Sequence, residues 1–326
     1  MAGSETLNAA ELTAAIKNHA LELGFSLVGI CSSAKDGDKD FYNWWVDQGF
    51  AADMHYLRAQ KEKRQSLEKI LPGTKSAVVC ALRFPGGSEK ISTIDDEDKE
   101  KIFGKIARYA LNQDYHRQLG EMLKKLAAYI DEKGSIPLNH KSLAYVDTGA
   151  IPERSLAERA GLGWVGKNAM LIHPEEGSWF WIGEVITTAE LINDQPLTDH
   201  CGKCRRCIDA CPTGAILEGI RAIDSRKCIA YLNIEHRGPI PKEFHEPMGD
   251  WLLGCDICQE VCPWNEHSLK RSRKNIGAPP VELVDVDKIL AMSKEEFQTL
   301  YKPRAVARAK LSGLKRNAEI IKKNHS

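Results

Sequence analysis

The spacing of cysteines constrains this chain more than any other feature of its sequence. Eight of its ten cysteines lie between positions 201 and 262, namely Cys201, Cys204, Cys207, Cys211, Cys228, Cys255, Cys258 and Cys262. The first four follow the pattern Cys-x2-Cys-x2-Cys-x3-Cys-Pro, in which three thiolates bind one [4Fe–4S] cluster and the fourth binds a second. A Cys-x2-Cys-x3-Cys-Pro set closes the region. The sequence therefore predicts a domain that holds two such clusters.

The ligands of each cluster follow from the direction of the chain. Three cysteines at x2 spacing surround one cluster, and the x3-Cys-Pro that follows begins a helix that points away from it, toward the second. By pseudo-symmetry, the closing set works in reverse. We assign one cluster to Cys201, Cys204, Cys207 and Cys262, and the other to Cys211, Cys228, Cys255 and Cys258.

Structural zinc and disulfide bonds are the alternatives for these cysteines. Structural zinc commonly uses two Cys-x2-Cys pairs for one ion and does not need Cys-Pro at both ends of the region. Disulfides require an oxidising compartment, whereas residues 1–8 have neither the basic start nor the apolar core of a signal peptide. No apolar run approaches the length of a membrane span. We therefore expect a cytoplasmic protein whose thiols are reduced.

Charge is distributed unevenly along the chain. The whole sequence has 45 Lys and Arg against 45 Asp and Glu, but residues 270–326 contain 14 basic and only 6 acidic side chains. A basic tail on an otherwise acidic chain indicates an anionic partner, and nucleic acid is the commonest such partner. A solvated helical face would explain the same charges equally well.

Helix and strand patterns alternate up to about position 193. Amphipathic helices are predicted at residues 11–24, 114–133 and 152–160, and buried strands at residues 25–30, 76–84, 143–146, 171–172 and 180–187. This alternation predicts an α/β (or α+β) domain built on one sheet. Helical propensity at residues 293–300 and 305–322 predicts a helical C-terminal segment. The predicted domains are residues 1–193, 194–269 and 270–326.

Asp147 stands out among the acidic residues because it follows a predicted buried strand and precedes Thr148-Gly149. Strand ends in α/β domains commonly carry catalytic groups. Burial beside a bulky apolar cofactor would raise the pKa of Asp147, so that the carboxyl holds a proton near neutral pH and acts as an acid. The alternative is an aspartate that caps the helix beginning near Pro152.

Two further motifs are similar to cofactor signatures but lack their context. Gly161-x-Gly163-x-x-Gly166 follows a predicted helix and precedes a strand, whereas a dinucleotide fingerprint follows a strand and opens a helix. Some enzymes ligate the cobalt of cobalamin through an Asp-x-His-x-x-Gly signature. Here Asp114-x-His116 begins the same way, but the glycine, Gly120, comes one residue later. We therefore predict no dinucleotide site and expect His116 to be a surface or capping histidine.

Several motifs together resemble the epoxyqueuosine reductase (QueG) family. They are Lys63-Arg64 before Leu71-Pro72-Gly73, Arg108-Tyr109-Ala110 before Asp114-Tyr115-His116, Tyr145-Val146-Asp147-Thr148-Gly149, Glu153-Arg154, Ala157-Glu158-Arg159-Ala160-Gly161, Gly166-Lys167-Asn168, Gly254-Cys255-Asp256 and Gly313-Leu314-x-Arg316-Asn317-Ala318, with the cysteine run between them. The resemblance covers nearly the whole chain. It implies an oxidoreductase that uses cobalamin to reduce epoxyqueuosine to queuosine at the wobble position of tRNA.

The resemblance also implies roles for particular residues. Asp147 matches the family's proton donor. The implied cobalamin contacts are Arg64, Ala107, Asp147, Leu171, Ile182, Ala230, Cys255 and Asp256. The family binds base-off cob(II)alamin, with no lower base on cobalt, which agrees with the imperfect Asp-x-His motif. The implied architecture is an α/β (α+β) cobalamin-binding domain, then a ferredoxin-like domain with two [4Fe–4S] clusters.

The C-terminal segment departs from the family pattern. Family members often continue into a longer HEAT-like helical repeat, whereas this sequence stops at Ser326. We expect a short HEAT-like segment and a reduced tRNA-binding surface. The residues expected on that surface are His236, Arg237, Lys302, Arg304, Arg308, Lys310, Lys315 and Arg316.

The expected mechanism follows from the chemistry of an epoxide. Its conversion to an alkene needs two electrons and a proton for the leaving oxygen. We expect electrons to pass one at a time through the clusters to cobalamin, while Asp147 protonates the oxygen. A flavodoxin- or ferredoxin-type protein is the expected electron donor, acting on a monomer that binds no membrane. A cobalamin-dependent reductive dehalogenase-like reductase and a ferredoxin-type electron carrier are the alternative functions.

Overall fold

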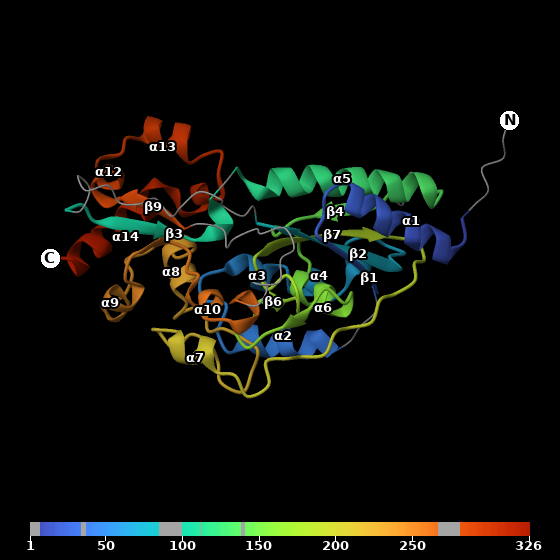
Figure 1. Cartoon of the computed structure of the whole chain (residues 1–326), viewed down its shortest axis with the longest axis horizontal. Coiled ribbons are helices and arrows are strands. Elements are labelled where there is room, and N and C mark those ends of the chain that lie inside the picture. The colour runs from blue at the N-terminus through green and yellow to red at the C-terminus, as the bar shows by residue number, and fades with distance from the viewer. Residues whose placement is uncertain (1–6, 34–36, 85–99, 112, 138–140, 267–280) are drawn as a thin grey trace.

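The computed structural model describes residues 7–33, 37–84, 100–111, 113–137, 141–266 and 281–326. Two layered regions lie side by side in Figure 1, a four-stranded sheet between helices and a three-stranded sheet that carries the C-terminal helices. The cysteine-bearing helices α7 (Arg206–Ala210) and α10 (Ile257–Glu260) lie below both sheets in that view. The first part of the basic tail, residues 270–280, falls outside the described residues.

The larger sheet has the strand order β1-β2-β7-β4, and every neighbouring pair is antiparallel. Its strands are β1 (Leu27–Ser32), β2 (Ser76–Arg83), β7 (Phe180–Thr187) and β4 (Leu143–Tyr145). The central strands β2 and β7 are buried along most of their length because helices cover both faces of the sheet. The predicted strands are confirmed, but the antiparallel pairing makes this region α+β.

Helices α1 (Ala9–Glu22) and α5 (Tyr115–Lys133) cover one face of the larger sheet (Figure 1). In α5, Leu119, Leu123, Leu126 and Ile130 are fully buried. Their spacing of three and four residues places them on the side of the helix that faces the sheet. Helix α6 (Glu153–Arg159) packs on the opposite face. All three helices predicted for this region are confirmed.

The smaller sheet has the order β8-β3-β9. Strand β3 (Phe103–Ile106) runs parallel to β8 (Trp251–Leu253) and antiparallel to β9 (Glu282–Asp285). The sequence patterns did not predict these strands. Each comes from a different one of the three predicted domains, so the three segments share one core here. The boundaries of those domains stay a prediction.

The C-terminal segment belongs to that core. A 3-10 helix, η6 (Ala305–Ala309), precedes α14 (Lys310–Asn324), and the single helix expected over residues 305–322 is therefore interrupted at Lys310, whose φ is +62°. In α14, Leu314, Ala318 and Ile321 are fully buried. The helix packs against β8 and α12 (Val286–Ala291). Burial of this apolar stripe anchors the basic helix to the smaller sheet.

The remaining elements are short. They are α2 (Gly37–Asp47), α3 (His55–Ala59), α4 (Lys61–Arg64), η1 (Leu67–Lys69), η3 (Arg108–Ala110), β5 (Trp164–Val165), β6 (Leu171–Ile172), α8 (Ile229–Ile234), η5 (Lys242–Phe244), α9 (His245–Met248) and α13 (Lys294–Leu300). Within the described parts of the chain, no helix combines the length and apolar character needed to cross a membrane.

Candidate active site and cluster ligands

Asp147 lies two residues beyond β4, in a tight turn that exposes its side chain. Its φ is +53°, in the left-handed region that aspartate tolerates better than most residues. The Thr148 N–H donates to the Val146 carbonyl at 2.5 Å and closes the turn. The Asp147 side chain is 58% exposed. The carboxyl therefore stands just after the strand, as the sequence predicts, where a substrate can reach it.

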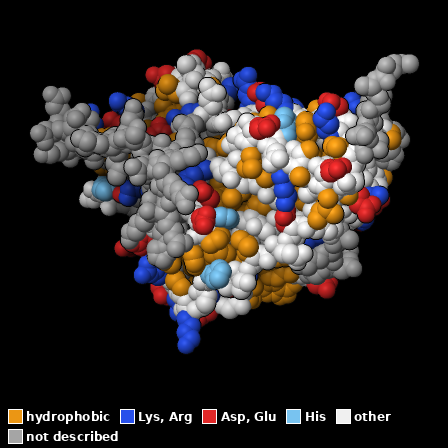
Figure 2. All heavy atoms as spheres, turned by 45° about the vertical axis from the view of Figure 1, so that its right-hand side comes forward, with side chains coloured by type: hydrophobic (Ala, Val, Ile, Leu, Met, Phe, Trp, Pro, Cys, Tyr) orange, Lys and Arg blue, Asp and Glu red, His pale blue; other side chains and the backbone are white. Residues whose placement is uncertain are grey.

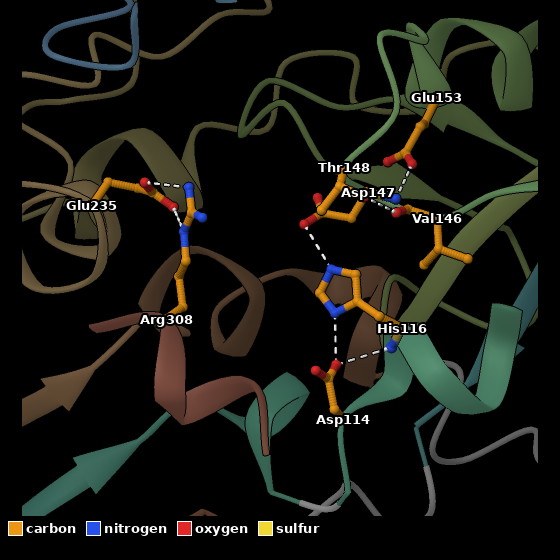
Figure 3. Close-up of polar contacts among 8 residues, drawn as sticks. All are labelled: Asp114, His116, Val146, Asp147, Thr148, Glu153, Glu235 and Arg308. Carbon is orange, nitrogen blue, oxygen red and sulfur yellow. Dashed lines mark hydrogen bonds and ion pairs between the residues drawn. The ribbon is translucent and has the colours of Figure 1, made fainter. Parts of the chain in front are cut away.

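His116 joins Asp147 to a second carboxylate, Asp114 (Figure 3). Its Nε2 lies 3.1 Å from Asp147 Oδ2, and its Nδ1 lies 2.6 Å from Asp114 Oδ1. Asp114 is also the N-cap of α5 and accepts the backbone N–H of His116 at 3.0 Å. The cap of this helix is therefore Asp114, and the His116 ring connects two acids that are distant in the sequence.

This hydrogen-bonded chain sets the charges of the site. The hydrogen bond from His116 holds the pKa of Asp147 below its ordinary value. Burial acts to lower the pKa of His116, but the hydrogen bonds to Asp147 and Asp114 outweigh it and raise that pKa. In the protein alone the paired imidazole competes for the proton and lowers the pKa of Asp147, whereas the raised pKa expected beside a bulky apolar cofactor stays a prediction. The arrangement favours an imidazolium beside an ionised carboxylate.

Two further carboxyls, of Glu153 and Glu184, lie behind the exposed pair. Glu153, the first residue of α6, accepts the Asp147 N–H at 2.5 Å, and burial raises the pKa of Glu153 to about 7. Glu184 on β7 is fully buried, and neither of its carboxyl oxygens has a hydrogen-bond partner among the described residues. Burial raises the pKa of Glu184 well above its ordinary value. The N-cap of α6 is Pro152, and no side chain caps that helix, so the capping alternative for Asp147 is wrong.

An ion pair lies opposite Asp147 and His116 in Figure 3. Arg308 of η6 contacts Glu235 through two bonds, Nε to Oε1 at 2.7 Å and Nη2 to Oε2 at 2.8 Å. The hydrogen bond to Glu235 raises the pKa of Arg308, and the charge of Asp147 adds to this rise. The site is thus bounded by an acid–imidazole side and an arginine–glutamate side.

Some of the residues expected to contact cobalamin meet beside this site. Ala107 follows β3 and lies so close to Gly254 that a Cβ added to the glycine would approach the Ala107 Cβ to 2.5 Å. Asp256, two residues beyond Gly254, is only 2% exposed. Burial raises the pKa of Tyr109, and the charges of Asp147 and Asp256 both add to that rise. Tyr109 therefore lies near enough to feel the charges of both Asp147 and Asp256.

Arg64, another residue expected to contact cobalamin, lies at the end of α4. It donates to the Ile151 carbonyl at 3.1 Å, and its buried Nε has no partner among the described residues. A guanidinium with one unused N–H donor fits a large cofactor rich in amide and phosphate oxygens. The other expected contacts, Leu171, Ile182, Ala230 and Cys255, lie on β6, on β7, on α8 and just before α10. All of these contacts stay predictions.

The first predicted ligand set lines a cavity of ≈ 190 Å³. The four cysteines at its wall are Cys201, Cys204, Cys207 and Cys262. Trp264 and His200 contribute rings to the wall, and the Trp164 indole N–H donates to Cys201 Sγ at 3.4 Å. A cavity walled by thiols and aromatic rings fits a [4Fe–4S] cluster. Among the described residues, no three metal-binding side chains converge closely enough to hold a single ion.

The second predicted set forms a group of its own. Desolvation raises the pKa of Cys255 to about 12, and the nearby thiols of Cys228 and Cys211 add to the rise. Desolvation likewise raises the pKa of Cys258, with contributions from Cys255, Cys228 and, more weakly, Cys207 of the first set. The cysteines therefore form two neighbouring groups. Desolvated thiols ionise readily only when a metal replaces the proton, so both groups suit cluster ligands.

The second cysteine group is the one linked to the acid site. The charge of Arg154, on α6, helps to hold down the pKa of Asp147 and also opposes the rise in the pKa of Cys228. Cys258 of the same group neighbours Cys207 of the first group. Arg154 therefore lies near both Asp147 and Cys228, and Cys258 lies near the cavity group.

All four arginines expected to contact tRNA have partners within the protein, as already described for Arg308. Arg304 is ion-paired with Glu282. Arg316 donates to the backbone carbonyls of Leu232, His236 and Gly238, at 2.9, 2.8 and 2.7 Å. Arg237 donates to the carbonyls of Ile234, Arg308 and Ala309. Arg316 and Arg237 thus connect the C-terminal helices to α8 and the residues that follow it, and Arg304 connects them to β9.

The lysines of the same set are more accessible. Lys302 and Lys310 are exposed and Lys315 is half-buried, whereas His236 is held by Asp53, with Nδ1 3.0 Å from Oδ2. Basic and acidic side chains are interspersed over the face shown in Figure 2. A role for any of these residues in binding tRNA stays a prediction.

Two protein families match parts of the chain. Residues 64–148 match the family described as "Epoxyqueuosine reductase QueG, DUF1730", and residues 200–265 match the "4Fe-4S double cluster binding domain". The first match includes Arg64, Ala107 and Asp147. The second includes all eight cysteines of the predicted ligand sets.

Similar proteins span nearly the whole chain. The epoxyqueuosine reductase of Gloeobacter violaceus is 38% identical over 317 residues, covering 95% of each chain. That of Escherichia coli is 36% identical over 307 residues, which cover 94% of this chain and 79% of the relative. A crystal structure of epoxyqueuosine reductase with an epoxyqueuosine-modified tRNA-Tyr stem loop has a TM-score of 0.83 and 29% identity, and the match covers 96% of this chain and 81% of the other. A Bacillus subtilis epoxyqueuosine reductase structure, described as having an aspartate-bearing catalytic loop swung out of the active site, has a TM-score of 0.82, 28% identity and coverage of 96% and 82%.

Proposed function

Because this chain belongs to the epoxyqueuosine reductase family, we propose that it reduces epoxyqueuosine in tRNA to queuosine, with Asp147 as the proton donor. The observation that carries this proposal is the 38% identity to a named epoxyqueuosine reductase over 95% of both chains. Support for the role of Asp147 comes from its exposed position after β4 and from the aspartate-bearing catalytic loop described for the Bacillus subtilis relative. The enzyme is an oxidoreductase of tRNA modification.

The cofactors divide the work with the protein. Two [4Fe–4S] clusters and a cobalamin, when bound, supply single electrons and a strongly reducing centre. Cys201, Cys204, Cys207 and Cys262 would hold one cluster, and Cys211, Cys228, Cys255 and Cys258 the other. The second group would lie on the electron path next to the active site, because Cys228 and Asp147 share Arg154 as a neighbour and Cys258 lies near Cys207.

The protein's own residues then place the substrate and move the proton. Arg64, Ala107, Leu171, Ile182, Ala230, Cys255 and Asp256 would hold cobalamin beside Asp147. The exposed carboxyl of Asp147 would deliver a proton to the epoxide oxygen as the carbon–oxygen bond breaks. Glu153 fixes the turn by accepting the Asp147 N–H, so the carboxyl reaches the substrate from a defined backbone position.

The proposal also includes contacts with tRNA and with an electron donor. We place tRNA across the exposed lysines Lys302 and Lys310, the half-buried Lys315 and the nearby Arg308, with a short HEAT-like helical segment supplying the surface. The remaining predicted contacts, His236, Arg237, Arg304 and Arg316, would act by supporting that surface. An external flavodoxin- or ferredoxin-type protein would provide electrons to a monomer.

Turnover with modified tRNA tests the function. Anaerobic enzyme with both cofactors and a chemical reductant is mixed with tRNA that carries epoxyqueuosine, and the nucleosides are analysed by mass spectrometry. The expected product has lost one oxygen atom. An enzyme that carries electrons but leaves the nucleoside unchanged would favour the electron-carrier alternative. Release of halide from a halogenated aromatic compound, without any change in tRNA, would favour the dehalogenase alternative.

The tRNA surface is tested by salt dependence. The triple variant Lys302→Gln, Lys310→Gln, Lys315→Gln should bind tRNA more weakly, and the slope of log affinity against log salt should flatten by roughly 0.7–0.9 for each phosphate that the protein no longer neutralises. Lys288→Gln, Lys322→Gln, Lys323→Gln is the matched control, because it removes the same charge elsewhere in the C-terminal segment. An unchanged slope in the first variant would mean that these lysines are solvated and do not contact tRNA.

A further inference from the structure

We propose that His116 holds a proton for the reaction and passes it to the substrate through Asp147, while Asp114 orients the imidazole. This inference rests on the proposed function, since it concerns the same reaction. It goes beyond a single acid by assigning the proton supply to three connected residues. His116 is thus a positioning residue that acts through Asp147.

The stoichiometry of the reaction calls for more than one proton. An epoxide plus two electrons and two protons gives an alkene and one water molecule. The first proton neutralises the oxygen as the ring opens to an alcohol, and the second converts the departing hydroxyl into water. The electrons come from the external one-electron donor. A lone carboxyl supplies one proton and must then be reloaded before the second step.

The geometry provides a route for reloading. Asp114 Oδ1 occupies the Nδ1 side of the His116 ring at 2.6 Å, so Nε2 is the nitrogen left to face Asp147 Oδ2 at 3.1 Å. The ring also stacks on Tyr115, with centroids 4.1 Å apart and an interplanar angle of 26°. Both nitrogens are therefore engaged with carboxylates, and the imidazole has one defined orientation.

The charged groups around the ring favour a proton on it. Helix α5 contributes Asp114 and the neutral Tyr115, and the turn after β4 contributes Asp147. Glu153 and Arg154 lie behind Asp147, where they act on its charge from α6. The Arg308–Glu235 pair faces the site from the other side (Figure 3).

The proton path follows from these charges. Two carboxylates on His116 raise its pKa, while the imidazole lowers that of Asp147, so the resting proton lies on His116. As the oxygen gains negative charge, Asp147 accepts the proton from Nε2 and gives one to the oxygen. The His116 side chain is 31% exposed, so the neutral imidazole can regain a proton from water before the second step.

The test is the pH dependence of a single turnover by pre-reduced holoenzyme. Wild-type enzyme should keep its rate at low pH and lose it as the pH rises through the raised pKa of His116. His116→Gln keeps a hydrogen-bond donor for Asp147 but carries no proton, and should lower the rate at neutral pH by ~10²-fold, with the fall displaced to lower pH. Asp114→Asn should shift the fall in the same direction with a smaller loss of rate. Arg117→Gln, an exposed change on the same helix, is the control and should leave the profile unchanged.

Two further measurements separate proton supply from structural support. Imidazole added to His116→Ala should restore part of the rate, with an efficiency that follows the concentration of imidazolium. In wild-type protein without substrate, an NMR titration should give His116 a pKa above that of an ordinary histidine, and Asp147→Asn should lower it. A wild-type pH profile in His116→Gln, or no rescue together with an unshifted His116 pKa, would overturn the proposal. Failure of the proposed function would look different, because wild-type enzyme itself would then leave epoxyqueuosine unchanged.

Discussion

The cysteine groups and the acid site differ in what completes them. The thiols of Cys255 and Cys258 have raised pKa values because the surrounding protein desolvates them and neighbouring thiols add to the rise. In the acid site, by contrast, His116 already has a carboxylate on each ring nitrogen. Bound clusters therefore complete the cysteine region, whereas the hydrogen bonds of the acid site form within the protein alone.

This difference shows how the two halves of the reaction can be separated. The supply of electrons depends on metal bound by the cysteine region. The supply of protons depends on hydrogen bonds between α5, the turn after β4 and α6. A substitution in the cysteine region should therefore leave the His116 titration unchanged, and a substitution in the acid site should leave the iron content unchanged.

The largest effect is expected from a cluster ligand. Cys211→Ser should lose the second cluster, so that iron falls from about eight to about four atoms per chain, and reduction of the substrate should stop because the electron path is broken. The His116 titration should remain as in wild type. Iron analysis and EPR of the reduced protein provide the measurement.

Cys31→Ala is the matched control for that variant. Cys31 is a buried cysteine on β1, outside the ligand sets, and should keep all of the iron. Loss of iron in the control but not in Cys211→Ser would contradict the ligand assignment. A changed His116 titration in Cys211→Ser would break the independence of the two regions.

A smaller effect is expected from Glu153, and it concerns stability. Its pKa is raised from 4.5 to about 7 in the folded protein. The stability that its neutral form provides is therefore fully present below pH 4.5 and is lost as the pH rises through about 7. Glu153→Gln keeps an oxygen to accept the Asp147 N–H but cannot ionise, so the fall in free energy of unfolding over this range should be shallower.

Anaerobic denaturation at several pH values measures that slope. Glu121→Gln, which removes an exposed carboxyl from α5, serves as the control and should retain the wild-type slope. An identical slope in Glu153→Gln would mean that Glu153 ionises alike in the folded and unfolded states. Ionisation of Glu153 would then play no part in the organisation of the site.

The smallest effect is expected at Glu184. Its buried carboxyl lacks a hydrogen-bond partner among the described residues, and an unsatisfied buried polar group costs about 1–3 kcal/mol. Glu184→Met has a similar volume and should raise the free energy of unfolding by up to about that amount. Glu184→Gln should gain little, because its amide would also be unpartnered. Equal or lower stability of the methionine variant would show that the carboxyl has a favourable role.

The two regions also differ in how far sequence alone could predict them. The cysteine pattern is local, so spacing within a short segment was enough to propose the two ligand sets, whose roles stay predictions. The acid site joins residues 114–116, 147 and 153, which no spacing rule connects. Asp147 was singled out from its place after a strand, but the hydrogen bond from His116 that lowers its pKa could not be predicted, because that partner is distant in the sequence.

The smaller sheet escaped prediction for a related reason. Strand β3 has four residues, too few for a clear alternation, and its partners β8 and β9 lie far along the sequence. The break between η6 and α14 was also missed, because helical propensity continues across Lys310. The basic residues looked like one surface in the sequence, whereas the fold uses Arg304 and Arg316 for internal contacts.

The role of Asp147 is tested most directly by a single-turnover measurement on Asp147→Asn. The variant keeps the shape of the side chain but cannot deliver a proton, and the rate of epoxyqueuosine reduction should fall by ~10²–10⁴-fold. Iron content, the EPR spectrum of bound cob(II)alamin and the affinity for tRNA should match those of wild type. Reduction within a few fold of the wild-type rate would contradict the claim that Asp147 delivers the proton.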